Sequence, residues 1–295
     1  MYIAKRTGST YAIYAPEDDR SSIRRLTLLG ELRHAITANQ LVLHHQPTVE
    51  LSTGKVLRTE ALLRWQHPEH GLMPPGEFME LAEMSGVVQP LTRWVLAQSI
   101  RQVRQLTVDG EFLHVAVNIS ARNLYEPDLV DWIVALLESE GFPGERLTLE
   151  LTESLLMDDP LLALGVLRRL KSFGISLSVD DFGTGYSSLA YLRDLPIDEI
   201  KIDQSFVAAM AHPGGDDTIV RSVIDLGHNL GLAVVAEGVE DTETLVRLRD
   251  MGCDRAQGFL FSHPLPAEDL AEVLHSQWFR QFATSHDDPP GREPM

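Results

Sequence analysis

The sequence has a single cysteine, Cys253, so the chain cannot form an internal disulfide. No run of apolar residues approaches the roughly 20 that a membrane-spanning helix needs. The first two dozen residues carry polar and charged side chains throughout and lack the apolar core of a secretory signal. These absences favour a reducing compartment, and we expect a cytoplasmic protein with no membrane insertion in this chain.

Basic residues are scarce, since 25 Lys and Arg stand against 43 Asp and Glu, for a formal net charge of -18. Such a charge repels polyanions at long range, so long nucleic acid is not an expected partner. A small anionic ligand stays compatible with it, because metal ions and a few Arg or Lys side chains can reverse the potential inside one pocket.

The length of 295 residues suits one α/β barrel with additional segments at its ends. We predict a leading segment and linker over residues 1–22, a main domain over residues 23–284 and a disordered tail over residues 285–295. Within the leading segment, Met1–Gly8 and Tyr11–Tyr14 resemble the closing helix and strand of a GGDEF diguanylate cyclase domain. That resemblance implies a longer tandem protein with a GGDEF or sensory domain upstream.

Short β-rich runs alternate with longer helical patterns, which is typical of a parallel α/β fold. The β-rich runs are Leu41–Glu50, Val56–Trp65, His114–Ile119, Leu147–Leu151, Ser176–Asp181, Glu199–Ile202, Ala233–Ala236 and Ala256–Phe261. The helical patterns include Leu26–Ala38, Leu91–Leu106, Leu161–Ser172, Thr218–Leu230 and Thr242–Met251. Eight runs predict a closed barrel. The alternative, an open doubly wound sheet, normally has a glycine-rich phosphate turn after its first strand, and residues 46–49 offer none.

Polar residues stand where six of these strands end, a position that faces the active site in barrel enzymes. They are Glu60, Asn118, Glu150, Asp180 with Asp181, Lys201 and Glu237. Each alone is compatible with a solvated cap or a structural ion pair. Several carboxylates that point at one another repel unless cations hold them, so the set predicts a metal site.

Carboxylate and amide oxygens favour a hard ion, so we predict Mg²⁺ or Mn²⁺ before Zn²⁺, with Ca²⁺ bound but inhibitory. The histidines at positions 44, 45, 67 and 70 lack the spacing of a zinc protease and are interpreted as surface or core residues.

Seven motifs, in this order, resemble the signatures of EAL-domain cyclic di-GMP phosphodiesterases over approximately Leu26–Phe282. They are Glu60–Trp65, Asn118–Ser120, Glu150–Glu153, Asp180–Gly185, Lys201–Asp203, Ala236–Glu240 and Gln257–Phe259. The resemblance implies a TIM-type (β/α)8 barrel whose first strand is antiparallel to the others. It also implies hydrolysis of cyclic di-GMP to linear 5′-pGpG in bacterial signal transduction.

The resemblance implies a role for each matching residue. Two ions are expected, one held by Glu60, Asn118, Glu150 and Asp180, and the other by Asp180 and Asp181 with Glu237 close to it. Glu237 would be the general base and Lys201 its orienting cation. Arg64 would bind a substrate phosphate, while Gln46 and Gln257 would line the dinucleotide pocket.

The glycine-rich segment Asp181–Leu189 predicts a mobile loop beside the metals. In the family this loop links the metal site to a dimer interface, so we expect a homodimer. The expected loop and regulatory residues are Glu153, Phe182, Gly183, Thr184, Gly185 and Glu240.

Two other functions stay open at this point. A catalytically silent receptor would bind cyclic di-GMP and act through partners, but such relatives typically lack metal ligands or the loop motif. An unrelated barrel lyase or isomerase could use the same carboxylates, since fold alone permits it.

Overall fold

The structure is a computed structural model that describes residues 27–108, 111–153, 160–184, 189–211, 217–275 and 279. The predicted leading segment, its GGDEF resemblance and the predicted tail lie outside these residues. Among the described residues, no helix is both long enough and apolar enough to cross a membrane.

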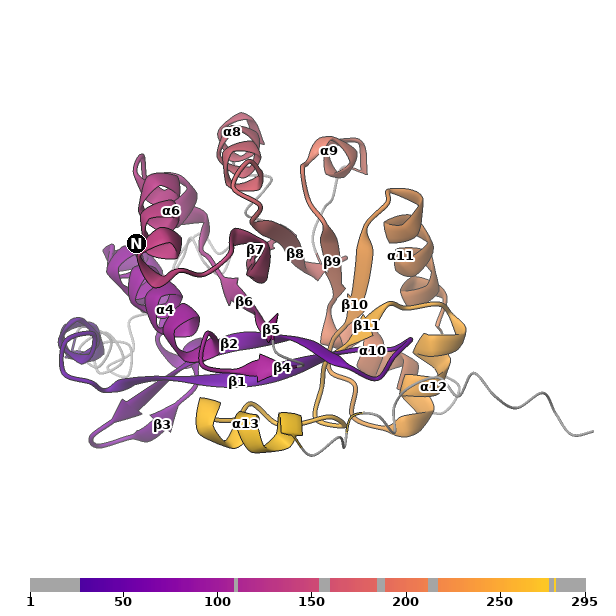
Figure 1. The fold of residues 1–295 in the computed structure, drawn as a ribbon, viewed down its shortest axis with the longest axis horizontal. Coiled ribbons are helices and arrows are strands. Elements are labelled where there is room, and N and C mark those ends of the chain that lie inside the picture. Colours follow the sequence, from indigo (N-terminus) through magenta and orange to yellow (C-terminus); the bar gives the residue numbers. More distant parts are fainter. Residues whose placement is uncertain are drawn as a thin grey trace, which may run out of the picture.

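Eight strands close into a barrel, as the sequence predicts (Figure 1). Their order is β1, β11, β10, β9, β8, β7, β6 and β2, and β1 then pairs with β2. The strands are β1 (Leu41–Glu50), β2 (Val56–His67), β6 (His114–Asn118), β7 (Leu147–Thr152), β8 (Ser176–Phe182), β9 (Glu199–Ile202), β10 (Ala233–Ala236) and β11 (Arg255–Ala256). All neighbours from β2 round to β11 are parallel, whereas β1 is antiparallel to both β2 and β11. The predicted antiparallel first strand is confirmed, and the open-sheet alternative is wrong.

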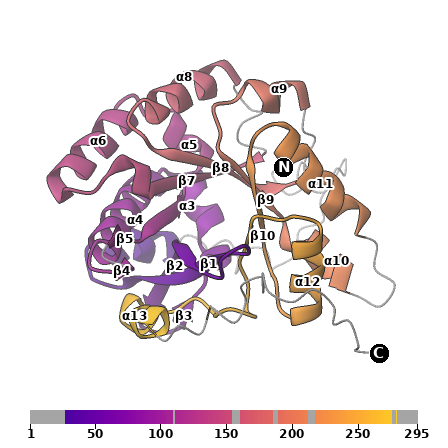
Figure 2. The same cartoon turned by 45° about the vertical axis from the view of Figure 1, so that its right-hand side comes forward.

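Helices surround the strands, as Figures 1 and 2 show from two directions. A helix over residues 27–35 precedes the barrel. The others are α3 (Met79–Ser85), α4 (Val88–Val103), α5 (Ala121–Leu124), α6 (Leu129–Glu140), α8 (Pro160–Lys171), α9 (Leu189–Asp194), α10 (Gln204–Ala211), α11 (Thr218–Asn229), α12 (Thr242–Asp250) and α13 (Ala267–His275), with short 3-10 turns η1 (Pro75–Glu77) and η2 (Gly144–Arg146). Outside the ring, β3 (Gly71–Met73) extends β2, and β4 (Thr107–Val108) pairs with β5 (Glu111–Phe112).

Strands β7 and β9 separate apolar from polar side chains, because successive residues of a strand point to opposite faces. In β7, Leu147, Leu149 and Leu151 are fully buried in the hydrophobic core. Between them, Glu150 points into the barrel and reaches Lys201 on β9, two strands away. The alternation therefore builds an apolar shell under the helices and a polar interior along the barrel axis.

The predicted last strand, Ala256–Phe261, is wrong over most of its length, since β11 contains only Arg255–Ala256. After β11 the chain turns, and the Phe261 N–H donates to the Gly258 carbonyl at 3.1 Å. In this turn Gly258 packs against the backbone of Val239. A side chain at position 258 would place its Cβ 2.1 Å from the Val239 carbonyl oxygen. Glycine permits this close approach, which ends the strand early.

Candidate active site

The carboxyl ends of the barrel strands bring the predicted site residues together. Asn118 ends β6 and pairs in register with Glu150 on β7, while Asp180 on β8 pairs with Thr152. Lys201 on β9 pairs in register with Val235 on β10, and Glu237 follows Val235 by two residues. These positions come from separate βα units, so only closure of the barrel places them around one point.

Lys201 is the centre of this cluster, with a fully buried side chain. Its Nζ lies 2.7 Å from Glu237 Oε1, 3.1 Å from Glu150 Oε2, 3.2 Å from Asp180 Oδ1 and 3.5 Å from Glu60 Oε2. Burial opposes the charged ammonium, but the four surrounding carboxylates outweigh it and raise the pKa of Lys201 well above its ordinary value. The side chain is therefore a permanent cation within the barrel.

Glu60 accepts hydrogen bonds from two side chains that lie far from it in the sequence. Asn118 Nδ2 donates to Glu60 Oε1 at 2.6 Å, and Gln257 Nε2 donates to Glu60 Oε2 at 2.6 Å. Gln257 also contacts Gln46 Oε1 at 3.1 Å. Burial disfavours the Glu60 carboxylate, yet Lys201 and these donors together lower its pKa. Glu60 is thus ionised and fixed in one orientation.

The remaining carboxyl groups lack enough positive charge. Burial, reinforced by Glu60, raises the pKa of Glu150 well above its ordinary value. Its Oε1 is buried and has no hydrogen-bond partner among the residues that the structure describes. Burial raises the pKa of Glu237 to about 7, against the opposing effect of Lys201. Burial and the charge of Asp180 raise the pKa of Asp181. One lysine cannot balance this set, so the site favours additional cations.

Asp180, Asp181 and Glu237 form the tightest group, with one oxygen from each within 4.8 Å of the others. Consecutive residues of a regular strand would point apart, but Asp181 has a left-handed backbone with φ of 54°. Its N–H also donates to Asp180 Oδ1 at 3.0 Å. An all-oxygen donor set with surplus negative charge fits a hard divalent cation.

The predicted substrate residues border the carboxylates. Arg64 shares a face of β2 with Glu60, and its Nη1 donates to the Leu63 carbonyl at 2.9 Å. Burial lowers the pKa of Arg64, while the nearby Glu60 charge opposes that shift. Gln46 pairs in register with Glu60, and its Nε2 donates to the Ser262 carbonyl at 3.1 Å.

Part of the predicted loop is described. Glu153 is buried, and its Oε2 accepts a hydrogen bond from the Gly183 N–H at 2.9 Å. Phe182 is buried, and Thr184 Oγ1 donates to the Asp181 carbonyl at 2.9 Å. The regulatory roles expected for these loop residues stay predictions, and the same holds for two other residues of the set. These are Gly185, which lies outside the described residues, and Glu240, which is exposed on the protein surface.

The four histidines that were not chosen as ligands have other partners or lie apart from the acidic group. His45 is buried, with Nε2 at 2.8 Å from Gln102 Oε1 on α4. His44 Nδ1 lies 3.2 Å from the Pro264 carbonyl. His67 and His70 stack on each other at the far end of β2.

Two residues of the site were not assigned from the sequence. The charge of Asp203 contributes to the raised pKa of Asp181. Asp203 follows directly after β9, two residues beyond Lys201, and this spacing is the signal that could have indicated it. Thr48 Oγ1 donates to Gln257 Oε1 at 2.9 Å, across 209 residues of sequence, and no local pattern indicates that contact.

The fold and the site define a TIM-type barrel with an acidic centre at the carboxyl ends of its parallel strands, and Asp180, Asp181 and Glu237 in that centre could hold a metal ion. The family model described as EAL domain matches residues 29–264. The chain therefore belongs to the EAL-domain family, and the unrelated-barrel alternative is wrong.

Curated relatives agree with this assignment. The chain is 42% identical over 273 residues to the Pseudomonas aeruginosa bifunctional diguanylate cyclase/cyclic di-GMP phosphodiesterase MucR, covering 92% of this chain and 40% of MucR. It is 45% identical over 257 residues to the cyclic di-GMP phosphodiesterase NbdA of the same organism, covering 87% of this chain and 33% of NbdA. The chain thus spans less than half the length of these relatives.

Solved structures share the fold. A structure of the PaMucR phosphodiesterase in complex with c-di-GMP has a TM-score of 0.79 and 44% identity, covering 83% of this chain and 99% of that one. The cAMP-bound EAL enzyme Bd1971 has a TM-score of 0.81 and 32% identity, covering 88% of this chain and 72% of that one.

Proposed function

We propose that this chain hydrolyses cyclic di-GMP to linear 5′-pGpG. One observation carries the proposal: the barrel gathers Glu60, Glu150, Asp180 and Glu237 around the buried ammonium of Lys201, with Asp181 beside Asp180 and Glu237. The names of MucR and NbdA, and the c-di-GMP complex of the MucR domain, support the choice of substrate.

We propose two Mg²⁺ or Mn²⁺ ions as cofactors. Glu60, Asn118, Glu150 and Asp180 would hold one ion, and Asp180 and Asp181 the other, with Glu237 beside it. The buried, unpartnered Oε1 of Glu150 and the raised pKa of Asp181 support this assignment. When bound, such ions lower the pKa of water and neutralise charge on a phosphodiester.

Glu237 would accept the proton of the attacking water. Its raised pKa, about 7, suits a base that works near neutral pH. Lys201 lies 2.7 Å from one Glu237 oxygen, which orients the carboxylate and leaves its other oxygen for the proton.

The substrate would lie against β1 and β2. Arg64 offers a planar set of donors suited to a phosphate. Gln46 and Gln257 are joined by a 3.1 Å hydrogen bond, and Gln257 also fixes Glu60. Substrate binding by these amides would therefore be coupled directly to a predicted metal ligand.

We also propose that the chain works as a homodimer regulated through the 181–189 loop. The hydrogen bond from the Gly183 N–H to Glu153 supports a link between this loop and the end of β7. The bifunctional name of MucR supports a cyclase domain elsewhere in the full-length protein.

Chromatography of reaction products tests the proposed function. The purified chain is incubated with cyclic di-GMP and Mg²⁺, Mn²⁺, Ca²⁺ or EDTA. We expect 5′-pGpG with Mg²⁺ or Mn²⁺ only, and at least about a 100-fold slower reaction for Glu237→Gln. Glu243→Gln, an exposed carboxylate on α12, is the matched control and should retain full activity. Binding without product would make the chain a receptor. If the chain neither binds cyclic di-GMP nor forms product, the proposal is refuted.

A further inference from the structure

The side chain of Gln257 connects the proposed metal site with the proposed substrate pocket. Gln257 follows directly after β11 and is only 4% exposed. Its Nε2 donates to Glu60 Oε2 at 2.6 Å and to Gln46 Oε1 at 3.1 Å. An amide nitrogen has two hydrogens to donate, so one is used on a proposed metal ligand and the other on a proposed substrate residue.

The orientation of this amide follows from what its two ends contact. Lys201 and the neighbouring donors lower the pKa of Glu60, and an ionised carboxylate only accepts hydrogen bonds. Glu60 therefore requires the nitrogen end of Gln257. The oxygen end points the other way, where Thr48 Oγ1 donates to Gln257 Oε1 at 2.9 Å. The Thr48 hydroxyl thus supports the orientation that serves both Glu60 and Gln46.

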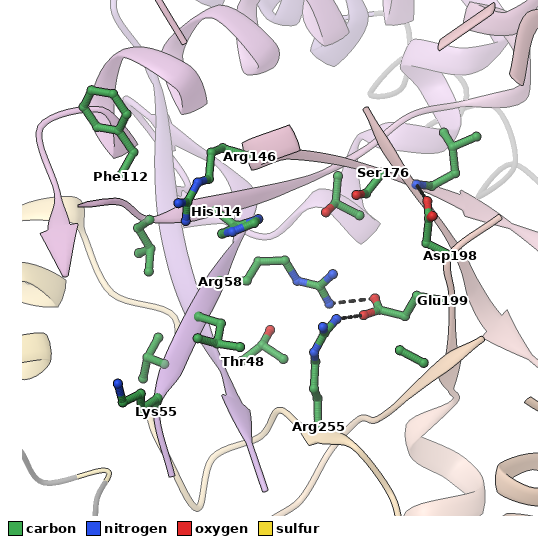
Figure 3. Close-up of a pocket in the computed structure, with 16 residues that line it drawn as sticks. Thr48, Lys55, Arg58, Phe112, His114, Arg146, Ser176, Asp198, Glu199 and Arg255 are labelled. Atoms are coloured by element: carbon green, nitrogen blue, oxygen red, sulfur yellow. Dashed lines mark hydrogen bonds and ion pairs between the residues drawn. The ribbon is translucent and has the colours of Figure 1, made fainter. Parts of the chain in front are cut away.

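Thr48 is itself firmly held. It is 1% exposed on β1 and pairs in register with Arg58 on β2. Its branched side chain has few rotamers, which restricts where the hydroxyl can lie. Figure 3 shows Thr48 on the wall of the cavity at the amino ends of the parallel strands, beside the ion pairs that Arg58 and Arg255 form with Glu199. Thr48 therefore approaches Gln257 from the side opposite the carboxylates.

We propose that Thr48 is a positioning residue that acts through Gln257 on both Glu60 and Gln46. This inference rests on the proposed function, since it concerns how metal and substrate are held. Without the hydroxyl, the buried Gln257 oxygen would lose its donor, and buried acceptors are nearly always satisfied. A shift of the amide toward another donor would disturb both hydrogen bonds from its nitrogen. Glu60 and Gln46 would then lose their fixed positions together.

A packing role for Thr48 makes the opposite prediction. Valine has nearly the shape of threonine but lacks the hydroxyl, whereas serine keeps the hydroxyl and lacks the methyl group. If Thr48 only filled space, Thr48→Ser would be the more harmful change. If Thr48 positions Gln257, Thr48→Val is the more harmful change and Thr48→Ser restores the wild-type behaviour.

Calorimetric titration of Mn²⁺ in the absence of substrate measures the effect on Glu60. We expect Thr48→Val to bind Mn²⁺ about tenfold more weakly, as is typical when a residue behind a metal ligand is changed, and Thr48→Ser to bind it nearly as tightly as the wild type. Thr92→Val is the matched control, because it also removes a buried threonine hydroxyl, which donates to Asn123 Oδ1 at 3.0 Å on the outer helices α4 and α5. This control should bind Mn²⁺ as the wild type does.

Steady-state kinetics with cyclic di-GMP at saturating Mn²⁺ measures the effect on Gln46. Thr48→Val should raise KM severalfold and leave kcat nearly unchanged, because Gln46 would hold the substrate equally well before and during the reaction. Wild-type Mn²⁺ affinity in Thr48→Val, or equal weakening in Thr48→Ser, would overturn the inference. A wild-type chain that binds Mn²⁺ but forms no product would refute the proposed function alone, since the Mn²⁺ titrations would still decide whether Thr48 positions Glu60.

Discussion

Two adjacent layers of the barrel interior carry opposite charge excesses. In the upper layer, Lys201 is surrounded by carboxylates, whereas in the lower layer Glu199 lies between Arg58 and Arg255. Glu199 and Lys201 are two residues apart on β9, about 7 Å along the strand. The same strand ladder therefore supports two buried sites of opposite sign.

The two layers differ in how well their buried carboxylates are balanced by cations of the chain. The lower carboxylate has all its partners within the chain, and Arg58 and Arg255 outweigh burial and lower the pKa of Glu199. The upper carboxylates lack such balance, and burial raises the pKa of Glu150 and of Glu237. A layer with more carboxylates than cations is suited to bind further cations from solution.

Removal of the central cation should have the largest effect. Lys201→Met leaves four carboxylates crowded in a buried site, and we expect a loss of about 3–5 kcal/mol in the free energy of unfolding in EDTA. Urea denaturation measures it, and Mg²⁺ should restore part of the loss. Lys171→Met is the control, since its partly exposed pair with Asp198 should contribute at most about 1 kcal/mol. Equal losses in the two variants would contradict the central role of Lys201.

The second prediction removes the charge of Glu199, the carboxylate of the lower layer. Glu199→Gln leaves Arg58 and Arg255 facing each other without a counter-charge, so unfolding should become easier by roughly 2–4 kcal/mol. The cost is below that of Lys201→Met because the glutamine oxygen still accepts one hydrogen bond. Urea denaturation at neutral pH checks this value, and a loss under about 1 kcal/mol would show that the layer is not internally balanced.

The same Glu-to-Gln change in the upper layer should have the opposite sign. Glu150→Gln removes one of several repelling carboxylates, so metal-free protein should gain about 1 kcal/mol of stability. Affinity for Mn²⁺ should fall by about tenfold or more, because a proposed ligand is lost. Denaturation in EDTA and calorimetric titration of Mn²⁺ measure the two effects. Destabilisation in EDTA would mean that Lys201 alone balances this layer.

The sequence predicts the upper layer better than the lower one. Glu150 and Lys201 lie near the carboxyl ends of β7 and β9, and parallel strands bring these ends to one face, so the sequence indicates that the two residues meet. Glu60 was expected at a strand end, but β2 continues to His67 beyond it. The Arg58–Glu199 pair joins positions 141 residues apart, and no local pattern predicts such a partner. The error in the last strand has a similar cause, since the contact of Gly258 with Val239 is a tertiary constraint.

A third environment, between the barrel and its helices, should respond least. His45 on β1 is fully buried against Gln102 of α4, and burial lowers its pKa below 6.5. A group whose folded pKa is lowered contributes stability above pH 6.5 and loses it as the pH falls through the folded pKa. The stability difference between wild type and His45→Gln should therefore shrink by about 1 kcal/mol or less from pH 7.5 to pH 5.

Urea denaturation across this pH range measures that difference, with EDTA present throughout. His70→Gln replaces an exposed ring at the end of β2, and its stability difference from wild type should stay nearly constant. A constant difference for His45→Gln as well would mean that neutral burial of His45 does not contribute to folding. A stability difference that shrinks as the pH falls would show that burial of His45 acts through desolvation. In the two charged layers inside the barrel, the neighbouring charges also act.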